Sequence, residues 1–104
     1  MALSKWLKGS SNELIVPEAT KIDPGAKEVL RAWVAGGNLH VSLRAEAWDD
    51  PTAWGVVLAD LAKHIARAYQ LQKQLDEAKV LERIKTVMDA ELLSSIQPSG
   101  RIVT

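Results

Sequence analysis

The 104-residue chain contains no cysteine, and this absence excludes several kinds of site. Disulfides, thiolate nucleophiles and cysteine-bound metals all require that side chain. A chain without cysteine fits a compartment in which disulfides do not form. We therefore expect a cytoplasmic protein.

The chain also has no surplus of either charge and no long apolar run. Thirteen Lys and Arg residues balance thirteen Asp and Glu residues. A nucleic-acid-binding protein usually carries a basic surplus or stripe. Nothing approaches the roughly 18 consecutive apolar residues of a membrane span. The sequence predicts neither a nucleic-acid partner nor a membrane partner.

Aromatic side chains are scarce and unevenly chosen. There is no phenylalanine and one tyrosine, but there are four tryptophans, so large aromatic burial is concentrated in a few places. Residues 1–11 end in a polar run and predict a loose leader, because chain ends are commonly poorly ordered. The alternative is a small docking or membrane-surface anchor. Residues 12–104 predict one domain of modest core size.

Two Asp-Pro pairs predict helix starts, because aspartate caps free backbone N–H groups and proline suits the first helical position. Asp23-Pro24 is followed by an apolar stripe and by Gly36-Gly37, a typical helix stop, which predicts a helix over 24–35. Asp50-Pro51 opens a much longer stripe. It predicts either one long helix or two helices, over 51–72 and 77–94. We favour two because the mean globular helix is about 11–12 residues long.

Residues 38–47 alternate strictly between apolar and polar side chains, which is typical of a half-buried strand. Residues 13–16 and 101–104 predict short partner strands. Together these elements predict an α+β fold. It is a small two-layer domain in which one main amphipathic strand, with one or two short partners, packs against two or three helices.

The helix that begins at residue 51 also predicts self-association. Opposite Trp54 it carries Val56 and Ala59, so its first turns are apolar or small nearly all round. Helices of this kind are usually buried on more than one side, and a sheet of so few strands leaves an edge open to pairing. Because symmetric dimers are the commonest oligomers, we expect a homodimer, formed through a sheet edge or through the helices.

Residues that could carry chemistry are few. His40 and Arg44 share the polar face of the 38–47 strand with Trp48 nearby, where they could bind an anionic small molecule or a partner's carboxylate. Asp60 and His64 are neighbours on a helix and could form a base-and-orienter pair, or only a surface hydrogen bond. The zinc, nucleophile-elbow and phosphate-loop motifs are missing, so we expect no cofactor and no metal.

The stretch "WDDPTAWG" places two carboxylates between Trp48 and Trp54. A cation could use the carboxylate oxygens, but such sites recruit further ligands at regular spacing, and none follows here. Capping by Asp50 is the better interpretation. Trp48 then either bends round to meet Trp54 or marks a surface that another chain covers.

The run "GGNLHVSLRAEAWDDPTAWGVVLADLAKHIARAY", together with "NELIVP" and "AKEVLRAWVAGG", resembles a family of short bacterial proteins known only as a domain of unknown function. Its distinctive part is W-[DE]-D-P-x-A-W-G followed by L-A-D-x-A-x-H. The resemblance implies a compact α+β bacterial protein, and it supplies no activity, cofactor or catalytic residue.

These patterns predict a non-enzymatic, homodimeric binding module that could also bind another protein. The alternative is a small-ligand-binding protein or enzyme that uses the face of His40 and Arg44 or the pair of Asp60 and His64. The candidate interface or ligand residues are His40, Arg44, Trp48, Trp54, Val56, Ala59 and His64.

Overall fold

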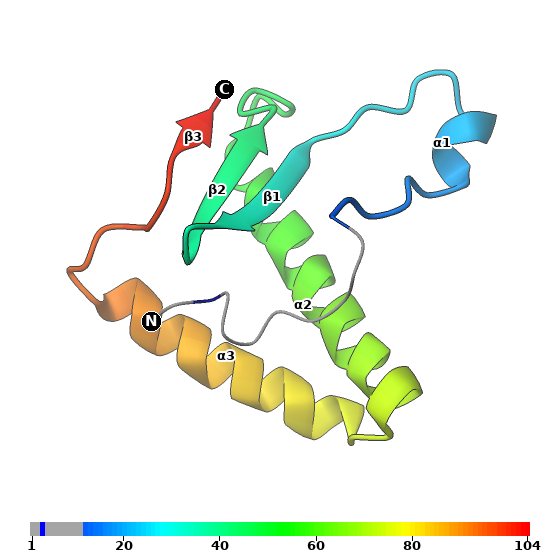
Figure 1. Ribbon diagram of the computed structural model, residues 1–104. Coiled ribbons are helices and arrows are strands. Elements are labelled where there is room, and N and C mark those ends of the chain that lie inside the picture. The colour runs from blue at the N-terminus through cyan, green and yellow to red at the C-terminus, as the bar shows by residue number, and fades with distance from the viewer. Residues whose placement is uncertain (1–2, 4–11) are drawn as a thin grey trace. The chain divides into compact units, whose positions relative to one another are not determined.

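The computed structural model describes residue 3 and residues 12–104 (Figure 1). The chain forms two compact units, residues 1–47 with 98–104 and residues 48–97. The first unit contains a three-stranded sheet and the second contains two long helices, so the predicted α+β class is confirmed. The leader predicted over 1–11 lies outside the described residues except for Leu3, whose N–H donates to the carbonyl of Gly37 at 3.3 Å.

The sheet is built from a hairpin and one short strand, in the order β1-β2-β3 (Figure 1). β1 (Leu30–Ala35) pairs antiparallel with β2 (Asn38–Leu43), and β2 pairs parallel with β3 (Ile102–Val103). The strand predicted over 38–47 is therefore confirmed as far as residue 43, and the strand predicted near 101–104 is also confirmed.

The helix predicted over 24–35 is wrong, because residues 30–35 form β1. Gly36 and Gly37 have φ of 59° and 79°, which suits a two-residue hairpin turn rather than a helix stop. That turn brings β1 alongside β2. The predicted helical stripe consists of Ala26, Val29, Leu30 and Trp33, and in β1 Leu30 and Trp33 lie on opposite faces of the strand instead.

Asp23 does not begin a helix either. It ends the short helix α1 (Ala19–Ile22), and its backbone N–H donates to the carbonyl of Ala19. Its Oδ1 accepts a hydrogen bond from the N–H of Gly25 at 2.8 Å, which makes a local turn. The short strand expected at residues 13–16 is absent as well, because these residues form no strand and join no sheet among the described residues.

The two-helix alternative is confirmed by α2 (Ala53–Lys73) and α3 (Glu77–Leu93). They are separated at Gln74, whose φ of 59° is left-handed and ends α2. The carboxylate of Asp76 caps α3 by accepting from the N–H of Ala78 at 3.1 Å. Arg67 and Glu77 then form an ion pair of 2.9 Å that joins the two helices.

The buried apolar residues of the described chain are both small and both lie on α2: Ala62, 8% exposed, and Ala66, completely buried. The larger apolar side chains of α2 and α3 remain at least partly exposed. We expected α2 to be covered on two sides, and within residues 48–97 it contacts α3 alone. In Figure 1 the two helices are close at their connection and lie apart at their other ends.

Candidate functional site

The start of α2 shows what the two aspartates do. The carboxylate Oδ1 of Asp50 accepts hydrogen bonds from the backbone N–H of Thr52 at 2.9 Å and from its hydroxyl at 2.7 Å. These two bonds lower the pKa of Asp50, and the backbone bond has the larger effect. The carbonyl of Asp50 also accepts from the N–H of Ala53 at 3.1 Å. α2 begins at Ala53 with Thr52 at the cap position, so the predicted cap at Asp50 and first helical residue at Pro51 both lie two residues too early. Asp50 instead fixes the turn that leads into the helix.

Trp48 bends round to meet Trp54, one of the two alternatives left open by the sequence. The ring centroids lie 5.3 Å apart with an angle of 87° between the planes, an edge-to-face contact. β2 has already ended at Leu43, so the alternation of that strand no longer governs where Trp48 points. Trp48 is still 39% exposed, so the pair keeps an apolar surface open.

A row of four large side chains continues from Trp54 along α2, at helical spacing. These side chains are between 38% and 49% exposed, and we call them the α2 row: Leu58, Leu61, Ile65 and Tyr69. On the helix the row lies beside the side that carries the buried alanines 62 and 66. It is an apolar stripe without a complete cover, where a fold of one chain would be expected to bury its largest side chains.

His40 holds the end of the chain to the hairpin. Its Nδ1 accepts from the N–H of Arg101 at 3.1 Å, and its Nε2 lies 3.2 Å from the carbonyl of Ala35. A carbonyl can only accept, so we assign the proton to Nε2 and the lone pair to Nδ1. Both ring nitrogens are engaged within the sheet unit, which leaves neither of them free for a ligand.

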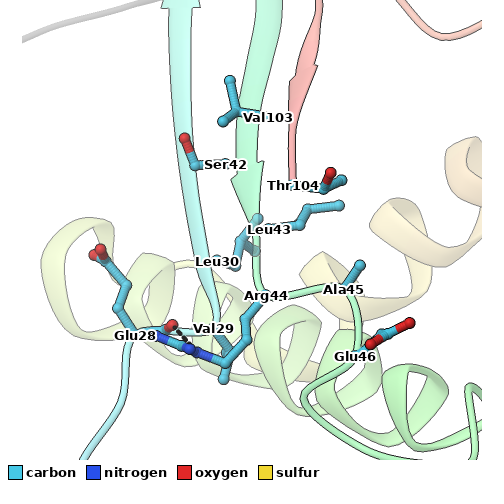
Figure 2. Close-up of a pocket in the computed structure, with 10 residues that line it drawn as sticks. All are labelled: Glu28, Val29, Leu30, Ser42, Leu43, Arg44, Ala45, Glu46, Val103 and Thr104. Carbon is cyan, nitrogen blue, oxygen red and sulfur yellow. Dashed lines mark hydrogen bonds between the residues drawn. The ribbon is translucent and has the colours of Figure 1, made fainter.

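Arg44 lies at the end of β2 beside an open hollow of about 650 Å³ (Figure 2). Its Nε donates to the carbonyl of Glu28 at 3.2 Å, the bond drawn as a dashed line. Apolar side chains from all three strands line the hollow, and two acidic side chains, Glu28 and Glu46, stand at its border. His40 is not among the lining residues, so the structure does not gather the predicted pair of His40 and Arg44 into one pocket.

The remaining candidates lie on α2 and are dispersed. Asp60 and His64 form no hydrogen bond or ion pair with each other. Val56 is 65% exposed, and Ala59 and His64 are exposed as well. Within the described part of the chain, no three acidic or histidine side chains are grouped closely enough to hold a metal ion. None of its helices is both long and apolar enough to cross a membrane.

Two features were missed by reasoning from the sequence. One is the attachment of residues 99–101 to β2, which depends on a contact between segments about 60 residues apart and leaves no local signal. The other is the exposure of Leu14, Ile15 and Val16, which are 96%, 94% and 55% exposed. Their apolar run predicted a strand of the sheet, and the structure places them in no helix or strand.

The chain is similar to one known protein family and to a solved bacterial structure. The family described as a domain of unknown function (DUF5076) matches residues 13–95. A solved structure from the photosynthetic bacterium Rhodopseudomonas palustrus CGA009, described as a "putative pyruvate dehydrogenase", is 33% identical with a TM-score of 0.67. The match covers 86% of this chain and 91% of that one. No curated protein matches the chain.

Proposed function

We propose that this chain, which belongs to the family with a domain of unknown function (DUF5076), is a non-enzymatic homodimeric interaction module. Its subunit contact is the α2 row together with the Trp48 and Trp54 pair. The observation that carries the proposal is the exposure of that row, 38% to 49% on four large side chains in a line. Contiguous exposed apolar patches of this kind mark interaction surfaces.

The row alone is small for a dimer interface. A second copy that covers it removes roughly 300 Å² of apolar surface from each chain, about 600 Å² for the pair, whereas a stable interface buries about 1,200–2,000 Å² in total. Buried area does not convert directly into affinity, because association costs on the order of 4–15 kcal/mol. The proposed dimer therefore needs a further contact beside the row.

The activity named for the Rhodopseudomonas protein is not part of the proposal. Decarboxylation of a 2-oxo acid uses a carbanion-stabilising cofactor such as thiamine diphosphate. The hollow beside Arg44 is open, and the carboxylates of Glu28 and Glu46 at its border would repel a diphosphate. Two carboxylates and one guanidinium line the hollow, so its net charge favours neither that cofactor nor another anionic ligand. A cytoplasmic location, consistent with the lack of cysteine, completes the proposal.

A matched pair of substitutions on α2 tests the proposed contact. Leu61→Glu places a charge in the α2 row, and Leu71→Glu makes the same change off the row, where the side chain is 75% exposed. Leu61 is itself 42% exposed, so its glutamate reaches water in an isolated chain and the helices stay folded.

Sedimentation velocity with far-ultraviolet circular dichroism gives the readout. We expect Leu61→Glu to sediment as a folded monomer and Leu71→Glu to remain a dimer. A dimer that survives Leu61→Glu unchanged, or that is lost equally in both variants, would refute the contact.

A further inference from the structure

The free edge of β1 and the exposed segment Glu13–Val16 fit one another. We infer that in the dimer Glu13–Val16 of each copy adds to the β1 edge of the other copy as a parallel strand. This inference rests on the proposed homodimer, because it needs a second copy. It adds to the α2 row a second contact between the two chains, the pairing of Glu13–Val16 with β1, and it specifies which residues lie opposite one another.

The backbone of β1 has a free side. Arg44 donates its N–H to the carbonyl of Val29, which fixes the hydrogen-bonding phase of the antiparallel pair. In such a pair successive residues alternate between facing the partner and facing away. Val29, Arg31 and Trp33 thus face β2, whereas Leu30, Ala32 and Val34 turn their N–H and C=O groups to the outer edge. No strand among the described residues occupies that edge.

The segment Glu13–Val16 carries exposed apolar residues that pair with no strand in the described part of its own chain. Leu14, Ile15 and Val16 are apolar, belong to no helix or strand, and are 96%, 94% and 55% exposed. Adjacent exposed apolar residues outside any regular element can extend and add to an open sheet edge. The segment and β1 lie in the same compact unit and do not pair there, and the proposed homodimer supplies a second copy that presents the segment to this edge.

One parallel register matches every side chain. It places Glu13 opposite Arg31, Leu14 opposite Ala32, Ile15 opposite Trp33 and Val16 opposite Val34. The pair of Glu13 and Arg31 joins opposite charges, and the side chain of Arg31 is still 46% exposed although its guanidinium also binds Glu28. Ile15 covers Trp33, which is 39% exposed, in an aromatic and β-branched pair that stabilises sheets.

The backbone agrees with this register. The N–H of Ala32 donates to the carbonyl of Glu13, and the N–H of Ile15 donates to the carbonyl of Ala32. The N–H of Val34 then donates to the carbonyl of Ile15. The next donor in the ladder would be residue 17, which is Pro17 and has no N–H, so the pairing ends where proline is tolerated.

Proline substitutions test the ladder without disturbing the folded chain, because the segment is exposed. Ile15→Pro removes the N–H that donates to Ala32, whereas Leu14→Pro removes an N–H that points away from β1. We expect Ile15→Pro to weaken dimerisation at least about tenfold, the equivalent of 1.4 kcal/mol for a lost hydrogen bond and its pairing. Leu14→Pro should weaken it clearly less. Equal dissociation constants for the two variants would overturn the register.

Cysteine pairs test whether the pairing joins two chains. The chain has no cysteine of its own, and adjacent strands lie about 4.8 Å apart, within disulfide reach. Two separately purified proteins, Leu14→Cys and Ala32→Cys, are mixed and oxidised. We expect a mixed disulfide between them, and we expect no link when Leu14→Cys is mixed with Trp33→Cys, which points to the opposite face.

The outcomes separate this inference from the proposed function. A wild-type dimer that gives no mixed disulfide refutes the strand exchange and leaves the homodimer standing. A link between two Ala32→Cys chains instead would show that β1 pairs with β1, which also refutes it. A wild-type monomer in solution refutes the exchange because no second copy is present. A chain that carries both Leu14→Cys and Ala32→Cys, stays monomeric and forms the disulfide within itself refutes it for the same reason.

Discussion

Replacing Gly100 by alanine should detach β3 from the sheet. Gly100 has a φ of 76°, and a Cβ built on it would overlap the carbonyl oxygen of Leu39 and lie 2.5 Å from its carbonyl carbon. Contacts below 3.0 Å are essentially never seen for real Cβ atoms, and both atoms here belong to the backbone of β2. The added methyl group therefore cannot be accommodated while residues 99–103 stay in place.

The stability lost in Gly100→Ala is limited to the interactions that hold residues 99–103 against β2. The hydrogen bonds of the β2–β3 pairing break, and so do three others: Val41 N–H to the Arg101 carbonyl, Arg101 N–H to His40 Nδ1, and Leu39 N–H to Ser99 Oγ. Each contributes about 1 kcal/mol. Ile102 and Val103 are 59% and 65% exposed, so little apolar burial is lost. We expect a destabilisation of about 3–5 kcal/mol, at which point β3 leaves the sheet and the cost stops rising.

Gly36→Ala is the matched control. Gly36 has a φ of 59°, but a Cβ there would meet nothing within 4 Å. It should therefore cost only the strain of a left-handed alanine, about 1–2 kcal/mol. The difference between the two variants isolates the close approach of Gly100 to β2.

Amide hydrogen exchange distinguishes detachment from general unfolding. Val41 and Leu39 donate toward the C-terminal segment, whereas the N–H groups of His40 and Ser42 face β1. In Gly100→Ala we expect Val41 and Leu39 to lose protection while His40 and Ser42 keep it. In Gly36→Ala, Val41 should stay protected. Wild-type protection of Val41 in Gly100→Ala would refute the reasoning.

Three further predictions concern the helix unit. Asp50→Asn should flatten the loss of stability in acid, measured by urea unfolding at several pH values. The lowered pKa of Asp50 means that its carboxylate stabilises the fold fully above its ordinary pKa of about 3.9 and that this contribution disappears as pH falls through the lowered value. An unchanged acid profile would contradict this. Gln74→Gly should stabilise by about 1 kcal/mol in urea, because glycine adopts a φ of 59° without strain, and a destabilised variant would show that the side chain matters more. Alanine variants of Trp48 and Trp54 should show a coupling of about 0.5–1.5 kcal/mol in a double-mutant cycle, and additive effects would mean that the ring contact contributes nothing.

Local chemistry in the sequence predicted the helix unit well. The break between α2 and α3 falls in the expected polar stretch, and Asp50 fixes the turn before α2 although the cap position is Thr52, two residues later than predicted. These features depend on residues a few positions apart, so short-range rules are sufficient for them. The long apolar stripe likewise predicted α2.

The same rules failed around Gly36 and Gly37 because one local pattern fitted two structures. The residues before the glycines are apolar at almost every position, which fits a helical stripe and a short strand alike. Two glycines likewise serve either a helix end or a hairpin turn. Their positive φ values decide for the hairpin, and that choice depends on the long-range pairing with β2.

The candidate site was only partly predictable for a related reason. The approach of Trp48 to Trp54 was one of two stated alternatives, and its geometry follows from a turn that the alternation of β2 could not reveal. His40 was singled out for its chemistry, but its partners Ala35 and Arg101 come from a hairpin and a chain end that the sequence alone does not join. The apolar stripe that contains Leu61 likewise does not identify the surface that packs against it.

The mass of the wild-type protein in solution tests the central claim most directly. Sedimentation equilibrium over a range of micromolar concentrations measures that mass without any label or substitution. We predict a species of twice the 11.4 kDa chain mass that dissociates on dilution. A single species of 11.4 kDa at every concentration would contradict both the α2 contact and the exchange of Glu13–Val16.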